Sequence, residues 1–176
     1  APPPQTIVIP HGPYPVATGV ASQLELRREM GIPPHAKVML SFGHIRDGKN
    51  LETILHAMVS AEQCHLIVAG REQSGTQKTA RAYQELAIKL GVADRGHWFV
   101  SYIPNEQVWR FFRAADRLLL LYTNDFHSMS GVLNVNAQFN LPVLASAGSG
   151  PLLTTVANYG LGTILNDVTP ATVSEA

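Results

Sequence analysis

The sequence predicts an α/β fold, a single domain in which a doubly wound parallel sheet carries helices on both faces. Short, continuous apolar segments alternate along the chain with longer segments of helical periodicity. A strand that is buried on both faces of a sheet is a continuous run of apolar residues, whereas a strand with one solvent-exposed face alternates apolar and polar residues. The 176 residues, 45% hydrophobic and 15% charged, suffice for one domain with a substantial core. We therefore expect residues 6–176 to form this domain and the proline-rich residues 1–5 to be a linker.

The strands are expected at the apolar runs, two of which end directly at Gly43 and Gly70. The apolar runs predict five or six strands. The right-handed crossover rule for parallel strands predicts that they lie in the order 3-2-1-4-5-6. A short extended piece at 6–10 precedes them. The expected strands are 37–42, 65–69, 97–101, 118–121, 142–145 and 162–165.

The helices are expected between these strands. Asn50 is expected to cap a helix whose apolar residues follow the i, i+3, i+4 spacing. Residues 130–140 alternate apolar residues with Asn and Gln in nearly period-two fashion, but two parallel strands flank them and need a crossover, which favours a helix. Residues 169–176 are expected to end without a cap or a closing helix. The other expected helices are 21–30, 76–90, 104–115 and 150–158.

Composition narrows the classes of function. Lys plus Arg and Asp plus Glu number 13 each, so no overall charge favours nucleic acid or a membrane surface. The single cysteine, Cys64, fits a reducing compartment and is expected to be buried and inert. No His, Cys, Asp or Glu cluster has the spacing of metal ligands, so no metal site is expected. No apolar run is long enough for a membrane-spanning helix.

The loop after the first strand, residues 43–50, combines two glycines and two cations ahead of a helix. Flexible backbone at Gly43, the side chains of Arg46 and Lys49, and free helix amides suit a diphosphate. The alternative is a solvated turn in which Arg46 pairs with Asp47. The loop lacks the spacing of either common glycine-rich phosphate motif.

The loop after the fourth strand carries Ser128, Ser130 and Gly131, which can offer hydroxyl and amide groups to the same phosphate. The alternative is ordinary N-capping of the next helix by one of the serines. Asn124, Asp125 and His127 could contact sugar hydroxyls, and the alternative for His127 is an ordinary surface histidine.

The loop after the third strand offers Tyr102 and Ile103 as an apolar surface with backbone polar groups for a nucleobase. Its alternative is a rigid turn between strand and helix. Arg71, at the end of the second strand, reaches the same pocket or only caps its strand. Ligands of open parallel sheets bind at the carboxyl ends of the strands, where all these loops lie.

Four segments together resemble one family in their order and spacing: Val8–Gly12, Ser41–Asn50, Ala114–Asp116 and Leu141–Ser146. They are similar to the entry segment, the glycine-and-lysine loop, the Ala-Ala-Asp segment and the Pro-Val strand of family-4-type glycosyltransferases. Those enzymes have the GT-B architecture of two facing Rossmann-like domains. The resemblance covers about 160 residues of this chain and identifies it as the C-terminal, nucleotide-sugar-binding half.

The resemblance implies a site. Lys49 with Arg46 would bind the donor diphosphate, and Tyr102 with Ile103 would flank the base, without a metal or another cofactor. Retaining members carry two glutamates eight positions apart before the Pro-Val strand, and the matching residues here are His127 and Val135. Because Val135 is not a glutamate, Asn134 or Asn136 would bind the ribose instead. Catalytic residues stay unassigned, with His127 and Asp125 as the candidates.

The resemblance also implies a function, transfer of a sugar from a UDP- or GDP-sugar to a glycan, lipid-linked or polysaccharide acceptor. That acceptor would bind to an N-terminal domain outside this chain, so this half alone would be inactive. Bacterial polysaccharide pathways, a cytoplasmic location and peripheral contact with the inner face of the membrane follow as expectations, with no nucleic-acid partner. The alternative is a non-catalytic module that binds nucleotide sugars or mediates an interaction.

Overall fold

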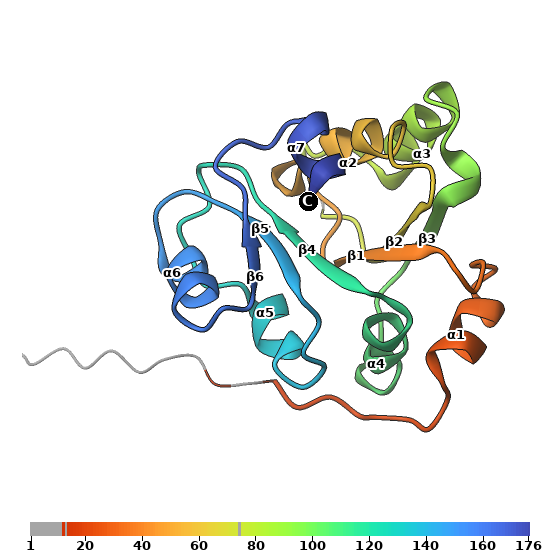
Figure 1. The fold of residues 1–176 in the computed structure, drawn as a ribbon, viewed down its shortest axis with the longest axis horizontal. Coiled ribbons are helices and arrows are strands. Elements are labelled where there is room, and N and C mark those ends of the chain that lie inside the picture. The colour runs from red at the N-terminus through yellow and green to blue at the C-terminus, as the bar shows by residue number, and fades with distance from the viewer. Residues whose placement is uncertain (1–11, 13, 74) are drawn as a thin grey trace, which may run out of the picture.

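The computed structural model describes residues 12, 14–73 and 75–176, which form a six-stranded, all-parallel sheet covered by helices (Figure 1). The strand order is β3-β2-β1-β4-β5-β6, which confirms the order expected from the crossover rule. The expected segment at 6–10 lies outside the described residues. The strands are β1 (Lys37–Phe42), β2 (Cys64–Gly70), β3 (Gly96–Val100), β4 (Arg117–Leu121), β5 (Val143–Ser146) and β6 (Gly162–Ile164).

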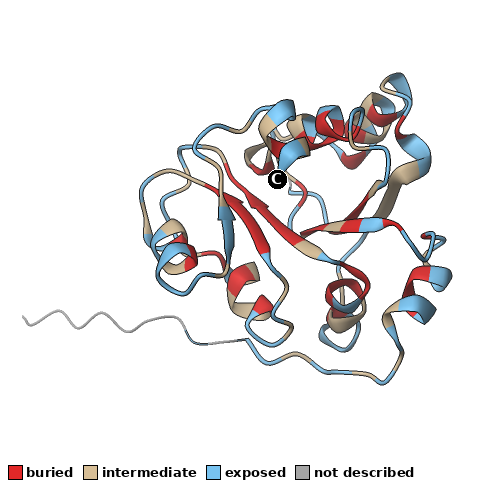
Figure 2. Ribbon diagram, viewed as in Figure 1, coloured by how far each residue is buried: buried red, intermediate tan, exposed pale blue. Residues whose placement is uncertain are grey.

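Two apolar cores, one on each face of the sheet, bury the inward sides of the helices (Figure 2). Helices α1, α4, α5 and α6 cover one face, and α2, α3 and α7 cover the other. No helix of the described part of the chain is long and apolar enough to cross a membrane. The helices are α1 (Gln23–Glu29), α2 (Leu51–Ala57), α3 (Ala80–Lys89), α4 (Asn105–Ala114), α5 (Gly131–Asn136), α6 (Pro151–Asn158) and α7 (Pro170–Glu175), with short 3-10 turns η1 (Asp47–Lys49) and η2 (Ala93–Arg95).

Two expectations about helix ends were wrong. Residues 169–176 do form a closing helix, α7, because Thr169 and Thr172 make a reciprocal capping box and Val173 is buried. Asn50 occupies the N-cap position of α2, but its side chain makes no capping bond. Instead its amide donates to the Leu121 carbonyl, at 3.3 Å, and so joins this helix start to the end of β4.

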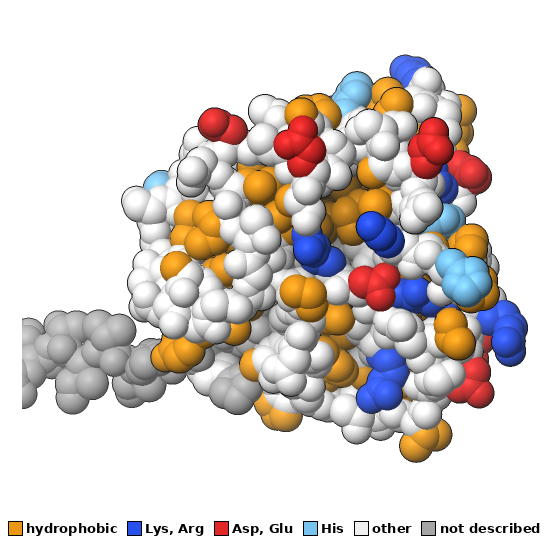
Figure 3. All heavy atoms as spheres, in the orientation of Figure 1, with side chains coloured by type: hydrophobic (Ala, Val, Ile, Leu, Met, Phe, Trp, Pro, Cys, Tyr) orange, Lys and Arg blue, Asp and Glu red, His pale blue; other side chains and the backbone are white. Residues whose placement is uncertain are grey.

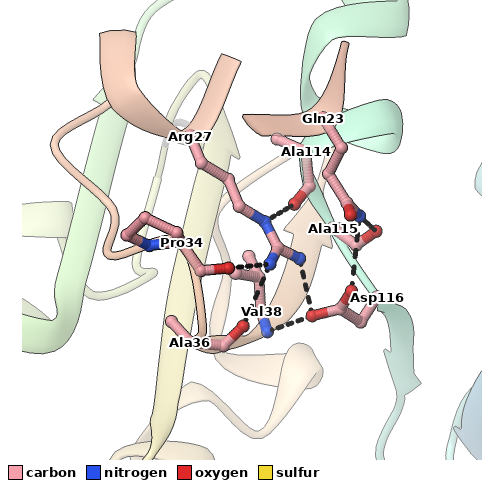
Figure 4. A network of polar contacts seen from close by, with 8 residues as sticks. All are labelled: Gln23, Arg27, Pro34, Ala36, Val38, Ala114, Ala115 and Asp116. Atoms are coloured by element: carbon pink, nitrogen blue, oxygen red, sulfur yellow. Dashed lines mark hydrogen bonds and ion pairs between the residues drawn. The ribbon is translucent and has the colours of Figure 1, made fainter. Parts of the chain in front are cut away.

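An ion pair at the amino ends of β1 and β4 fixes these two strands against α1 (Figure 4). Arg27 Nη2 lies 2.7 Å from Asp116 Oδ2, and the Arg27 side chain is only 5% exposed. The same Asp116 oxygen accepts the backbone N–H of Val38 at 2.8 Å. The guanidinium also donates to the carbonyl oxygens of Ala114, Pro34 and Ala36. The Ala-Ala-Asp segment is therefore structural, since it ties α4, β1 and β4 together.

We expect Arg27→Met to lower the free energy of unfolding by about 2 to 4 kcal/mol, because several buried carbonyl groups lose their donor. Urea denaturation measures this change, with Arg113→Met on the exposed side of α4 as the matched control. The control should stay within about 0.5 kcal/mol of the wild type. Equal, small changes in both variants would show that the buried network contributes little.

Candidate functional site

Two adjoining clefts open at the carboxyl edge of the sheet. The first, of about 380 Å³, lies between the loops after β1 and β4, and the second, of about 200 Å³, lies between the loops after β1, β2 and β3. Gly43 and His44 line both clefts, so the two are contiguous. A Cβ on Gly70 would lie 2.0 Å from the Gly43 carbonyl oxygen, and both glycines have positive φ. Glycine at position 70 thus lets β1 and β2 end so close together, and the positive φ favours glycine at position 43.

Lys49 supplies the buried charge of the first cleft. The residue is 8% exposed, and its Nζ donates to the Phe42 carbonyl at the end of β1. Burial, with a smaller contribution from the Arg46 guanidinium, lowers the pKa of the Lys49 amine to about 7. No carboxylate of the described residues lies within 4 Å of Nζ. A buried amine without a counter-charge is a good partner for an incoming anion.

Arg46 stands beside Lys49 and is held by aromatic rings rather than by an acid. Its guanidinium lies 5.7 Å from the ring centre of Tyr122 and 5.8 Å from that of Phe126. Asp47, the partner in the alternative interpretation of this loop, accepts hydrogen bonds from the Tyr83 hydroxyl at 2.6 Å and from the Lys78 N–H at 3.1 Å. These interactions lower the pKa of Asp47, which is engaged away from Arg46. Arg46 therefore makes no ion pair within 4 Å among the described residues, and its charge acts on Asp125 only at longer range.

His44 and Arg71 join the two clefts. Arg71 Nε donates to His44 Nε2 at 3.1 Å, so the neutral imidazole carries its proton on Nδ1. Desolvation lowers the pKa of His44, and the charges of Arg71, Lys49 and Arg46 lower it further. Three cationic side chains thus act on one histidine, which makes this edge of the sheet electropositive.

The second cleft has the apolar lining expected for an aromatic ring. Phe42, Gly70 and Ile103 provide apolar and backbone surface, and Tyr102, 71% exposed, stands at its rim. Arg71 lines the same cleft. The residues expected to surround a base are therefore brought together.

The residues expected to bind phosphate in the loop after β4 differ in whether they line the first cleft. Gly131 lines the first cleft. Ser130 also lines it, but this residue is 2% exposed and its hydroxyl is hydrogen-bonded to Tyr122 Oη at 3.0 Å. Ser128 lines neither cleft. Of the two serines expected to bind phosphate, the structure thus gives Ser130 a partner within the protein and leaves Ser128 outside the cleft.

Three further candidates also line neither cleft. His127 Nδ1 donates to the Ser149 carbonyl at 2.9 Å, and Asp125 accepts the Thr123 hydroxyl. Asn134 has a buried amide nitrogen with no hydrogen-bond partner. None of these three candidates lines either cleft, although the Arg46 charge, after the hydrogen bonds that Asp125 accepts, helps to lower the pKa of Asp125.

Val135, at the position of the second family glutamate, and Asn136, a substitute candidate for the ribose contact, differ in their surroundings. Asn136, the second ribose candidate, is buried and exchanges hydrogen bonds with the Leu141 backbone at 2.8 and 3.2 Å. It therefore holds the connection from α5 to β5. Val135 lines the first cleft, so an apolar side chain faces the ligand space where the resemblance implies a glutamate.

Sequence reasoning missed Tyr14, which forms a wall of the first cleft. A Cβ on Gly131 would lie 3.4 Å from Tyr14 Cε2. The segment that carries Tyr14 is anchored by Gln138, whose side-chain amide exchanges hydrogen bonds of 3.1 and 2.9 Å with the Val16 backbone. No local pattern marks such a contact, because its partners lie far apart in the sequence.

A larger hollow, of about 450 Å³, lies at the opposite edge of the sheet between α2 and α7. Figure 3 shows hydrophobic side chains gathered around this face near the C-terminus, with Lys and Arg side chains beside them. Cys64 lines this hollow, and burial raises the pKa of its thiol. The hollow is far from the loops at the carboxyl edge. Among the described residues no group of three or more His, Cys, Asp or Glu side chains could hold a metal.

A family model described as glycosyl transferases group 1 matches residues 22–176. The chain belongs to this family. A D-inositol 3-phosphate glycosyltransferase of Corynebacterium efficiens is 28% identical over 151 residues, which are 82% of this chain and 34% of the relative. A protein of the same name from Thermomonospora curvata is 30% identical over 155 residues, 84% of this chain and 35% of the relative. The chain spans about a third of the length of these curated relatives.

Solved structures of other proteins share the fold of this chain, which is a member of the glycosyl transferases group 1 family. The C-terminal domain of LpcC from Francisella tularensis has a TM-score of 0.69 at 15% identity and covers 91% of this chain and 82% of that one. Anabaena HepE, solved with UDP-glucose, has a TM-score of 0.73 at 16% identity over 91% of this chain and 43% of that one. These likenesses confirm the expected Rossmann-like half of a GT-B architecture.

We expect Lys49→Met to raise the free energy of unfolding, and to raise it more at pH 7 than at pH 10. The unfolded chain keeps the Lys49 proton up to about pH 10.5, whereas the folded protein keeps it only up to about pH 7. Wild-type stability therefore falls as the pH drops from 10.5 to 7, and the variant lacks this contribution. Urea denaturation at several pH values, with exposed Lys89→Met as control, measures the difference. A pH-independent difference would contradict the burial of an unpaired amine.

Proposed function

We propose that this chain is the donor-binding half of a glycosyltransferase and holds a nucleoside diphosphate sugar at the carboxyl edge of its sheet. One observation carries the proposal. Lys49 and Arg46 line a cleft that continues past His44 into a second, smaller cleft, and the described residues lining the two include no carboxylate. The diphosphate would bind in the first cleft and the base in the second.

The comparisons support a uridine nucleotide as the donor to test first. HepE, which shares the fold, was solved with UDP and with UDP-glucose. A GDP-sugar is the other donor to test. The base would lie against Tyr102 and Ile103, with Arg71 at its edge. Ribose contacts from Asn134 need that side chain to turn from its buried position.

The chemistry of transfer would draw on the same cations. When the bond from the sugar to the diphosphate breaks, negative charge grows on the leaving phosphate, and fixed positive groups stabilise it. Lys49 and Arg46 would supply that stabilisation without a metal ion or another cofactor. Gly131 lets the phosphate approach the backbone at the start of α5.

The groups that act on the acceptor lie elsewhere in this proposal. His127 donates to the Ser149 carbonyl in the loop after β5, and Asp125 accepts from Thr123 within its own loop. Val135 presents no carboxylate to the cleft. We propose that a glycan or glycolipid acceptor and its general base belong to a facing domain outside this chain. A peripheral membrane site and a cytoplasmic location go with such an acceptor and stay predictions.

A non-catalytic nucleotide-sugar-binding module is the second candidate, and the apolar Val135 in the cleft favours it. The whole protein, tested with UDP-sugars and GDP-sugars against a panel of acceptors, separates the two. Sugar transfer supports the enzyme. Binding of the donor without turnover of any sugar supports the module.

We expect Lys49→Ala to weaken UDP binding about ten- to hundredfold, since hydrogen bonds to charged groups contribute about 1.5 to 3 kcal/mol. Arg46→Ala should act in the same direction. Isothermal titration calorimetry measures both, with Lys89→Ala as a control that leaves the affinity unchanged. Wild-type affinity for UDP in both cleft variants would place the phosphates elsewhere.

We expect Gly131→Val to abolish donor binding in a folded protein. A Cβ at Gly131 already lies at 3.4 Å from the Tyr14 ring, so the added methyl groups press on Tyr14 or fill the cleft. Gly131→Ala should show a smaller effect, because it adds the Cβ alone. Calorimetry gives the affinities and circular dichroism verifies the fold. A folded Gly131→Val variant with wild-type affinity would mean that this helix start takes no part in binding.

A further inference from the structure

We propose that Tyr122 and Phe126 form a stacked platform that positions the Arg46 guanidinium for the donor diphosphate. The two rings lie 4.1 Å apart at an interplanar angle of 18°. The guanidinium carbon lies within 5.8 Å of both ring centres. This inference rests on the proposed function, because it takes the bound anion to be the donor diphosphate.

The platform is fixed to the sheet through Tyr122. This residue follows β4 directly, is 4% exposed, and its hydroxyl is hydrogen-bonded to Ser130 Oγ at 3.0 Å. Its backbone N–H donates to the Ser146 carbonyl at 2.9 Å, and its carbonyl accepts the Ser146 hydroxyl at 2.9 Å. Tyr122 is thus held from the end of β5 and from the start of α5.

Phe126 completes the platform from the turn that follows. Its N–H donates to the Thr123 carbonyl at 3.0 Å, which closes the turn and brings the ring back over Tyr122. Both rings line the first cleft, as does Arg46. The guanidinium carbon is nearly equidistant from the two ring centres and therefore lies beside the stacked pair, at the wall of the ligand space.

Aromatic partners suit a phosphate-binding arginine better than an acidic partner would. A carboxylate would orient the guanidinium but would also neutralise it and occupy its N–H groups. A ring attracts the cation through its face and leaves the edge N–H groups free to bind an anion. No carboxylate of the described residues lies within 4 Å of Arg46, which agrees with this division of roles.

The platform also explains why the Ser130 hydroxyl is buried. Its hydroxyl was expected to bind phosphate or to cap α5, yet it makes no capping bond and is buried against Tyr122. Ser130 and Tyr122 are thus positioning residues, which act on the ligand through Arg46.

A double-mutant cycle on UDP binding tests the proposal. By calorimetry, Phe126→Leu is expected to raise the Kd for UDP about two- to fivefold, the effect of losing an exposed cation–π contact. In the Arg46→Ala background the same substitution should change the Kd little. Phe126→Tyr should keep the wild-type affinity, because it keeps the ring. Phe139→Leu, an aromatic substitution that spares the Arg46 contacts, should show no coupling to Arg46→Ala.

A second variant guards against a folding defect in the first. Tyr122→Phe keeps the ring and removes only the bond to Ser130, so its smaller increase in Kd should also vanish in the Arg46→Ala background. Equal fold-changes with and without Arg46 would overturn the platform while leaving donor binding intact. A folded wild-type protein that binds neither UDP nor GDP would overturn the proposed function, and the platform with it.

Discussion

The parallel pairing of β1 with β4 is the constraint on which the site depends. Met39 and Leu40 of β1 lie opposite Arg117 and Leu118 of β4, although a whole sheet half, β2 and β3, separates these strands in the sequence. The strand order switches sides at this point, because β2 and β3 extend the sheet beyond β1 whereas β5 and β6 extend it beyond β4. The loops after β1 and β4 therefore leave the sheet side by side. The Thr123 N–H donates to the Gly48 carbonyl at 3.1 Å and so links the two loops directly. The Arg27–Asp116 pair holds the amino ends of the same two strands.

The cleft that results holds two basic side chains that no carboxylate of the described residues pairs with within 4 Å. Lys49 lies buried with a carbonyl as its partner, and Arg46 rests on aromatic rings. Burying an amine in this way opposes folding, and the two apolar cores must offset it. Such a trade of stability for binding is typical of functional sites, where local rules of folding are broken for a ligand. Burial, followed by the charges of Arg71, Lys49 and Arg46, lowers the pKa of His44, so the neutral imidazole can accept from Arg71 without adding another charge.

Much of the fold followed from the sequence, because continuous apolar runs such as that at 118–121 leave a buried strand as the simplest solution. The edge at which the two clefts open followed as well, since parallel strands place their carboxyl ends together. The directions in which individual side chains point could not be predicted from the sequence. Ser130 turns inward to Tyr122, and Asn136 turns to the α5–β5 connection, because each finds a buried partner that only the packed fold provides. The capping box of α7 was missed because Thr172 stands where glutamate or glutamine is usual. Tyr14 was missed because its contacts with the cleft are tertiary.

The central claim is that the carboxyl edge of the sheet, through Lys49 and Arg46, binds a nucleoside diphosphate. Titration of the isotope-labelled protein with UDP, followed through backbone amide NMR shifts, tests this most directly, because it maps the ligand without any substitution. The account predicts saturable shifts that cluster at 43–50, 101–104 and the start of α5. Shifts that cluster instead at the hollow between α2 and α7, or no saturable shifts with UDP or GDP, would contradict it.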